Sequence, residues 1–162
     1  MAQEKISFEQ FLEVVDTYYR TFTQDLHSYL LDNGCKITIN EKKSGFLASY
    51  KHGRTKRSVV NLLFRKKGML VRIYGENAGK YVDFLNTLPS EMVQSIEKAG
   101  ICKRLVHNTC SPKCLGYDFT IGSKHFQKCK YSCFEFLVSE ESNFHIKSFV
   151  EHELRERESI AI

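Results

Sequence analysis

Two cysteine pairs are the residues of this chain best suited to chemistry. The first is Cys110-Ser-Pro-Lys-Cys114 and the second is Cys129-Lys-Tyr-Ser-Cys133, so each pair encloses three residues. Thiolates bind zinc and also carry out redox reactions, and a short spacing on a turn is the usual way to present two sulfurs together. The pattern therefore indicates either a structural metal site or a cluster of reactive thiols.

A zinc ion bound by protein ligands needs four donors arranged as a tetrahedron. The Ser-Pro dipeptide inside the first pair favours a turn that brings both of its sulfurs to one ion. In an extended strand, Cys129 and Cys133 would lie about 13 Å apart, too far to share an ion. We therefore predict zinc as the cofactor, with these ligands: Cys110, Cys114, Cys129 and, as the fourth, Cys102, for which His107 and His125 are alternatives.

Other functions of the cysteines stay open at this point. A redox role for Cys110 and Cys114 requires a stabilised thiolate, and Lys113 is the cation that the sequence supplies. Cys110 and His107 would act as nucleophile and base only if the fold placed them in hydrogen-bond contact. Cysteine is also among the most often buried residues, so free thiols that only fill space are the third interpretation. A small enzyme or thiol redox sensor is thus the alternative function, and we predict no catalytic residue.

Positive charge is concentrated in one segment. Residues 36–80 contain twelve Lys or Arg and two acids, a net charge of +10, whereas the whole chain carries +5. Such side chains bind phosphates, and Tyr50 or His52 offers a ring on which a base can stack. We predict binding of nucleic acid or another polyanion by Lys51, Arg54, Lys56, Arg57, Arg65, Lys66 and Lys67. The alternative is that lysines only protect sheet edges and hairpin tips from aggregation.

The known catalytic motifs give little support to an enzyme. The sequence has no glycine-rich phosphate loop and no Gly-x-Ser-x-Gly elbow. The segment His152-Glu153-Leu154-Arg155-Glu156 lacks the second histidine of a zinc-protease helix. We interpret it as the solvated face of a helix.

The first half of the chain predicts one long helix followed by a sheet. Apolar residues recur every three or four positions from Phe8 to Leu30, and Ser7 with Gln10 forms a capping-box pattern before them. After Gly34 the period changes to two, as in strands. The predicted strands form a four-stranded antiparallel meander over residues 36–39, 46–51, 58–65 and 69–74.

The second half predicts helices, a hairpin and a last helix. Apolar spacing over residues 81–96 indicates a helix that restarts at Pro89, followed by a short strand at 102–106. Gly122-Ser123 joins a strand at 117–121 to a return strand at 124–138, and Ser142 or Asn143 caps the last helix. The predicted fold class is α+β, an antiparallel sheet with helices packed on one face and long N-terminal and C-terminal helices.

The strand Phe46-Leu47-Ala48-Ser49-Tyr50-Lys51, which leads into a basic hairpin, and the order of the elements resemble a known group of proteins. Over residues 36–155 the chain is similar to the small α+β domains of the MmcQ/YjbR and YdhG-like type. The resemblance implies a curved sheet with helices on one face. It brings no common activity, cofactor or site residue with it.

Length and composition predict one domain over residues 1–162. With 42% apolar residues and two prolines, the chain has enough material for one core and no linker. The first residues lack a basic and apolar leader, and no apolar run is long enough to span a bilayer. We therefore expect a cytoplasmic binding domain that is a monomer or weak homodimer, does not contact membranes and keeps its thiols reduced.

Overall fold

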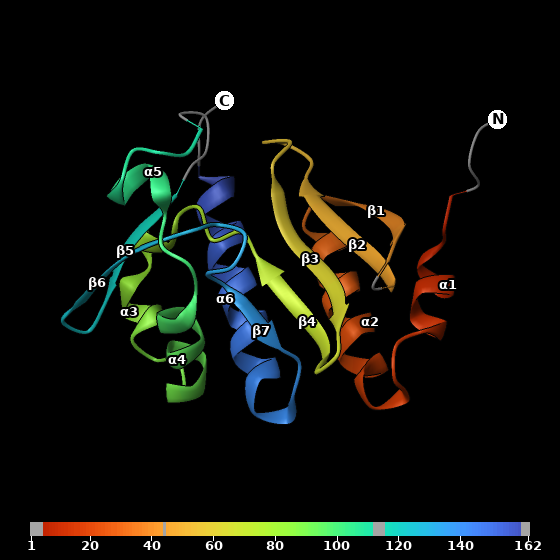
Figure 1. Cartoon of the computed structure of the whole chain (residues 1–162). Helices are drawn as coiled ribbons and strands as arrows, with labels where there is room; N and C mark the ends of the chain where they lie inside the picture. Colours follow the sequence, from red (N-terminus) through yellow and green to blue (C-terminus); the bar gives the residue numbers. More distant parts are fainter. Residues whose placement is uncertain (1–4, 44, 112–115, 160–162) are drawn as a thin grey trace.

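A computed structural model of the chain describes residues 5–43, 45–111 and 116–159. Its strands form a five-stranded antiparallel sheet in the order β1-β2-β3-β4-β7 and a separate hairpin, β5-β6 (Figure 1). The strands are β1 (Cys35–Lys42), β2 (Gly45–His52), β3 (Ser58–Arg65), β4 (Gly68–Ile73), β5 (Tyr117–Ile121), β6 (Lys124–Lys128) and β7 (Glu135–Leu137). The helices are α1 (Phe8–Glu13), α2 (Thr17–Asp32), the 3-10 turn η1 (Ala78–Lys80), α3 (Val82–Leu85), α4 (Ser90–Lys98), α5 (Lys103–Val106) and α6 (Glu140–Glu158). The predicted α+β class is confirmed.

The predicted long N-terminal helix is divided in two. The capping box at Ser7 is present, but Asp16 starts a second helix by accepting a hydrogen bond from the backbone N–H of Tyr18 at 3.0 Å. Arg20 fixes the break, because its guanidinium donates to the carbonyl oxygens of Val15 (3.0 Å) and Glu13 (3.2 Å). These bonds satisfy carbonyl groups that a helix end would otherwise leave without partners.

The four-stranded meander is confirmed, whereas the long return strand is wrong. Strand β6 ends at Lys128, and the backbone N–H of Cys133 donates to the carbonyl of Cys129 at 3.0 Å, which forms a turn. After this turn β7 leaves the hairpin and pairs with β4. The strand predicted at residues 102–106 is also wrong, since α5 occupies that segment and only Ile101 bridges to Lys128.

The last helix begins three residues earlier than predicted. Ser139 caps α6 by accepting from the N–H of Ser142 at 3.2 Å, and the Ser142 hydroxyl accepts from the N–H of Ser139 at 3.0 Å. Helix α6 then buries Ile146, Phe149 and Val150 completely. The predicted restart of a helix at Pro89 is confirmed by α4.

Helices α2 and α6 cover the same face of the five-stranded sheet and leave its other face without a helical layer over β1–β4 (Figure 1). The core lies between this sheet and the helices, where Ala48, Leu62 and Val71 from three neighbouring strands are fully buried. No helix among residues 5–43, 45–111 and 116–159 has both the length and the hydropathy that a bilayer crossing needs. The uncovered side, which we call the open face, is the surface on which the predicted basic site must be tested.

Candidate anion-binding surface

The open face carries a row of polar side chains that crosses all five strands. Strand pairing places Thr38 opposite Ser49, Ser49 opposite Asn61, Asn61 opposite Arg72 and Arg72 opposite Glu135. Side chains of residues directly opposite each other lie on the same face of a sheet. The register therefore collects polar residues that are far apart in sequence into one line.

The next row on the open face is apolar. Leu63 lies opposite Leu70, and Leu70 lies opposite Leu137. Leu47 continues the row because β2 and β3 pair through the neighbouring residues Ala48 and Leu62. We call Leu47, Leu63, Leu70 and Leu137 the leucine row. Leu137 at its end is 39% exposed, Leu47 and Leu70 are partly buried and Leu63 is 4% exposed, so the row offers apolar surface mainly at Leu137 and less toward Leu63.

A small hollow lies where the leucine row meets the ends of β1 and β3. It has a volume of about 190 Å³, and its lining includes Lys42, Leu47, Leu63, Arg65 and Arg72. We call it the basic hollow. Its three cations come from three different strands and surround an apolar floor, an arrangement that suits an anion attached to apolar groups.

The charges around the basic hollow are not equally available. Arg72 forms an ion pair with Glu135, with 2.8 Å between Nη2 and Oε2. Lys42 and Arg65 are exposed, and neither forms an ion pair with any other residue of the described ranges. Lys42 and Arg65 thus supply most of the free positive charge, and the turns beside them add Lys43, Lys66 and Lys67.

The predicted site residues fall into two groups at opposite ends of the sheet. Arg57 precedes β3, whereas Arg65 is its last residue. The eight residue steps from Arg57 to Arg65, at about 3.3 Å each, place these two residues roughly 26 Å apart. The structure therefore does not bring the seven predicted cations together. Arg54, Lys56 and Arg57, which we call the loop cluster, lie at one end together with Lys51, which pairs with Ser58 at the start of β3. The other group is Arg65, Lys66 and Lys67.

The loop cluster holds its loop against helix α6. Arg54 donates to the carbonyl oxygen of Glu158 at 2.8 Å, and Arg57 forms an ion pair with Glu76 at 3.1 Å. His52 contacts the Glu158 carboxylate at 2.7 Å. These contacts give Arg54 and Arg57 a structural role, and Glu76 compensates the charge of Arg57.

The stacking role predicted for Tyr50 and His52 is wrong, because both rings are buried. Tyr50 is 0% exposed and His52 is 1% exposed. The Tyr50 hydroxyl hydrogen-bonds Nδ1 of His27 at 2.8 Å on the helix-covered side, and burial raises the pKa of this hydroxyl. Lys51 does lie on the open face. It is paired directly with Lys36 on β1, so two positive charges are neighbours there.

The structure places the predicted zinc ligands as follows. Cys102 is buried, Cys129 is partly buried and Cys110 is exposed, whereas Cys114 lies outside the described residues. Hydrogen bonds from the N–H of Cys102 to the carbonyl of Gln127 and from the N–H of Cys129 to that of Gly100, both 2.9 Å, place two ligand segments side by side. No three metal-ligating side chains converge within the described ranges. The zinc site stays a prediction.

Two histidines were alternatives for the fourth zinc ligand. Nε2 of His125 contacts the Asp118 carboxylate at 2.6 Å, and this hydrogen bond lowers the pKa of Asp118. His107 follows α5 and is exposed. His125 is therefore already engaged by a neighbour on the β5-β6 hairpin, which makes it a weaker choice than Cys102.

Sequence reasoning missed a buried charged network on α6. Glu153 is 0% exposed and Arg157 is 1% exposed, so the interpretation of this segment as a solvated face is wrong. The Glu153 carboxylate accepts hydrogen bonds from Arg157 (2.8 Å), Tyr81 (2.6 Å) and both the backbone and the side chain of Asn77 (3.0 and 2.8 Å). The signal was present in the spacing, since Glu153 and Arg157 continue the buried stripe of Phe149 and Val150.

Several of these observations make the basic hollow the best candidate site. It lies on the open face, it combines unpaired cations with an apolar floor, and it includes Arg65 from the predicted set. Lys42 and Arg72 were not among the seven predicted anion-binding residues, because only the register shows that they lie near Arg65. Comparison of the chain with protein-family models, curated proteins and solved structures gave no match.

Proposed function

We propose that the protein binds single-stranded nucleic acid through the open face. The observation that supports this proposal best is the basic hollow, where Lys42, Arg65 and Arg72 surround the floor formed by Leu47 and Leu63. Cations bind phosphates, and an apolar floor contacts sugars or unstacked bases. An unpaired strand offers both kinds of surface in one molecule.

A duplex fits the open face less well. Its bases are stacked inside, so that a flat sheet would meet mainly phosphates, and the leucine row would have no apolar partner. The face extends about 20 Å along β1 from Lys36 to Lys42. That length suits a site of about four nucleotides, the lower end of the range for sheet proteins that bind single strands. A cytoplasmic location belongs to the same proposal, since free thiols persist there.

Protection of sheet edges is the competing explanation of the charges. It accounts for Lys43, Lys66 and Lys67, which lie in turns and are exposed. It does not explain why three cations from three strands surround one hollow with a leucine floor. A side chain that only prevents aggregation needs no such convergence.

The test measures the affinity of a fluorescently labelled oligothymidylate by anisotropy over a range of salt concentrations. The variant K42E/R65E reverses two charges of the basic hollow. The control K80E/K98E makes the same change in net charge at two exposed lysines of η1 and α4. We expect the hollow variant to lose at least tenfold in affinity and its salt slope to fall by about 1.4, since each phosphate contact on a single strand contributes about 0.7.

The two variants separate site binding from general electrostatic attraction. The proposal requires that the control retain most of the affinity and the slope. Equal losses in both variants would show that only net charge matters. An affinity that does not respond to salt or to K42E/R65E would refute binding at the basic hollow. Circular dichroism on each variant verifies that the fold is intact.

A further inference from the structure

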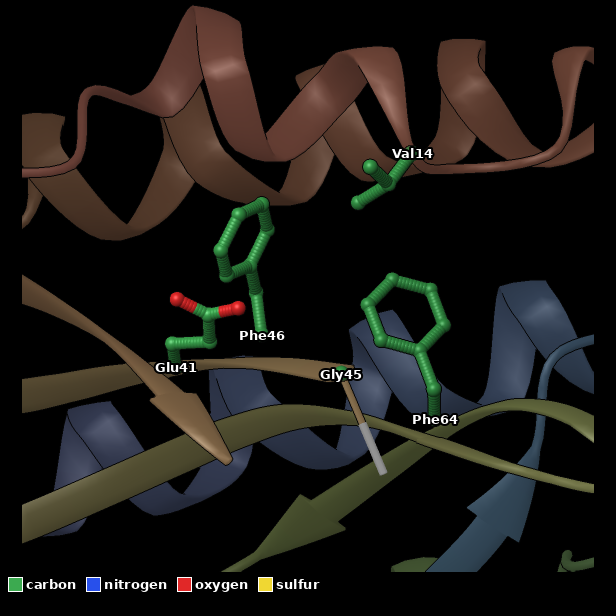
Figure 2. A pocket seen from close by; sticks show the side chains of 5 residues that line it. All are labelled: Val14, Glu41, Gly45, Phe46 and Phe64. Carbon is green, nitrogen blue, oxygen red and sulfur yellow. The ribbon is translucent and has the colours of Figure 1, made fainter. Parts of the chain in front are cut away.

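A second hollow lies on the other side of the sheet, beside the turn that joins β1 and β2. It has a volume of about 350 Å³ and is lined by Val14, Glu41, Gly45, Phe46 and Phe64 (Figure 2). We call it the aromatic pocket. Its volume lies at the lower end of the range for small-molecule sites, and its walls are mainly apolar with one charged group.

The break in the N-terminal helix forms one wall of this pocket. Val14 caps α1 immediately before Asp16 starts α2, and its side chain is 53% exposed. Figure 2 shows Val14 extending from this segment toward the Phe46 and Phe64 rings, which rise from the sheet. In a continuous helix the Val14 side chain would point in another direction, so this wall of the pocket depends on the break between α1 and α2.

The position of the Phe64 ring depends on Gly45. Gly45 has a φ of +122°, and a Cβ added to it would lie 3.3 Å from Cδ2 of Phe64. On its other side the Phe64 ring packs against buried Phe11, with 5.5 Å between the ring centroids. The ring is therefore fixed by the core, while its free side forms the wall of the pocket.

Glu41 is the charged group of the aromatic pocket. It lies directly opposite Phe46 in the pairing of β1 and β2 and is exposed. Residues 36–80 contain one other acid, Glu76, which pairs with Arg57. Glu41 forms no ion pair within the described part of the chain. A carboxylate only accepts hydrogen bonds, so it selects a ligand that presents N–H groups.

The aromatic pocket and the basic hollow are neighbours. Gly45 and Phe46 line both of them. Lys42 follows Glu41 in β1, and alternation along the strand directs the two side chains to opposite faces. A single ligand that bends over this end of the sheet would contact Glu41 with one part and Lys42 with another.

We propose, on the basis of the proposed function, that the aromatic pocket receives one base of the bound strand and that Glu41 selects guanine. Bases of single strands stack on aromatic side chains and form hydrogen bonds through their Watson–Crick edges. Guanine presents two adjacent donors on that edge, N1–H and the 2-amino group, which match the two oxygens of a carboxylate. Thymine and uracil present carbonyl oxygens on both sides of one N–H, and these oxygens are repelled by Glu41.

An organic cation is the other ligand that two phenyl rings and a carboxylate can bind. The surroundings of the pocket oppose it, because Lys42, Lys43 and Arg65 lie at the same end of the sheet. Their field repels a cation and attracts a phosphate. A base attached to phosphates meets both requirements.

The experiment compares two labelled hexamers, one of thymidine only and one in which a single guanine replaces the third thymidine. The two probes carry the same number of phosphates, so a difference in affinity reports on the base. We expect the guanine to raise the affinity of the unmodified protein about tenfold, as one bidentate contact to a base does. In E41Q the advantage of guanine falls to less than about twofold, and the hexathymidylate binds at least as tightly as before.

A matched control removes an acid elsewhere. Asp32 ends α2 at the opposite end of β1, roughly 20 Å from Glu41, and is exposed. D32N should keep the full advantage of guanine. F46L should weaken the guanine hexamer about tenfold through lost stacking and the hexathymidylate less, whereas Y131L, which alters an exposed ring on another segment, should change neither.

The outcomes distinguish this inference from the proposed function. If the unmodified protein binds both hexamers equally, or if E41Q keeps the advantage of guanine, selection by Glu41 is refuted while binding at the basic hollow stands. If tetramethylammonium competes for the pocket and guanine gives no advantage, the pocket binds organic cations and the inference fails. If neither hexamer binds, the proposed function and this inference both fail.

Discussion

Replacing Glu153 with glutamine should destabilise the protein strongly, although this residue lies far from the basic hollow. The substitution keeps the size of the side chain and removes its charge. Arg157, which is 1% exposed and lies 2.8 Å from the Glu153 carboxylate, would then be a buried cation without its carboxylate partner. The Nη2 atom of Arg157 and the nearest oxygen of Glu76 are 3.9 Å apart, so Glu76 compensates only in part.

The magnitude follows from the burial of both partners. Removing one member of a buried ion pair typically costs about 3–5 kcal/mol. Glu153 also accepts hydrogen bonds from Tyr81 and Asn77, and a glutamine amide can satisfy only some of these donors. We therefore expect E153Q to lower the free energy of unfolding by about 3 kcal/mol or more, out of the roughly 5–15 kcal/mol that is typical of a folded domain.

Urea unfolding followed by circular dichroism is the suitable assay, since the chain contains no tryptophan. Glu156 provides the control, because it belongs to the same helix and forms no ion pair within the described residues. E156Q should change the free energy of unfolding by less than about 0.5 kcal/mol. Equal, small effects of E153Q and E156Q would contradict the assignment of Glu153 and Arg157 as a buried, coupled pair.

Two further predictions concern His27 and the zinc site. Burial lowers the pKa of His27 in the folded protein, whereas in the unfolded chain this pKa is about 6.5. The unfolded chain therefore binds the proton more tightly. The contribution of His27 to stability should be constant above about pH 6.5 and should fall as the pH drops below it. Thermal unfolding at several pH values should show this loss, and H27Q should reduce it; an unchanged pH dependence in H27Q would assign the effect to other groups. Native mass spectrometry of protein purified without chelator should find one zinc per chain that C129S removes, and metal-free unmodified protein would refute the predicted site.

The elements with a regular apolar period were predictable from sequence. The meander was found because β1–β4 are runs rich in β-branched and aromatic residues, separated by clusters of Gly, Lys and Asn. The turn at Cys129–Cys133 was missed because its residues Lys130, Tyr131 and Ser132 do not include the glycine or proline that usually marks one. The break near Asp16 was missed because the apolar spacing continues across it, and the Arg20 contacts that fix the break are visible only in three dimensions.

The candidate site was only partly predictable for a related reason. Charge counting located the basic segment, and Arg65 belongs to the basic hollow. Strand register decides which cations lie together, however, and register depends on pairing between distant residues. The structure therefore was needed to place Lys42 and Arg72 beside Arg65. Arg54 and Arg57 instead hold their loop against α6 and Glu76. This role was not predictable, because their partners are up to 104 residues away in the chain.

The contacts between the loop cluster and α6 also constrain how the protein folds during synthesis. Arg157 donates to the carbonyl of Arg57 across 100 residues, and Arg54 donates to that of Glu158 across 104. At about 5–20 residues per second, a ribosome needs roughly 5–20 seconds to make the intervening chain. The loop after β2 thus emerges well before the helix that satisfies it. During that interval the Arg54 guanidinium lacks the carbonyl acceptor of Glu158, so docking of α6 is the step that fixes Arg54 and the loop that carries it.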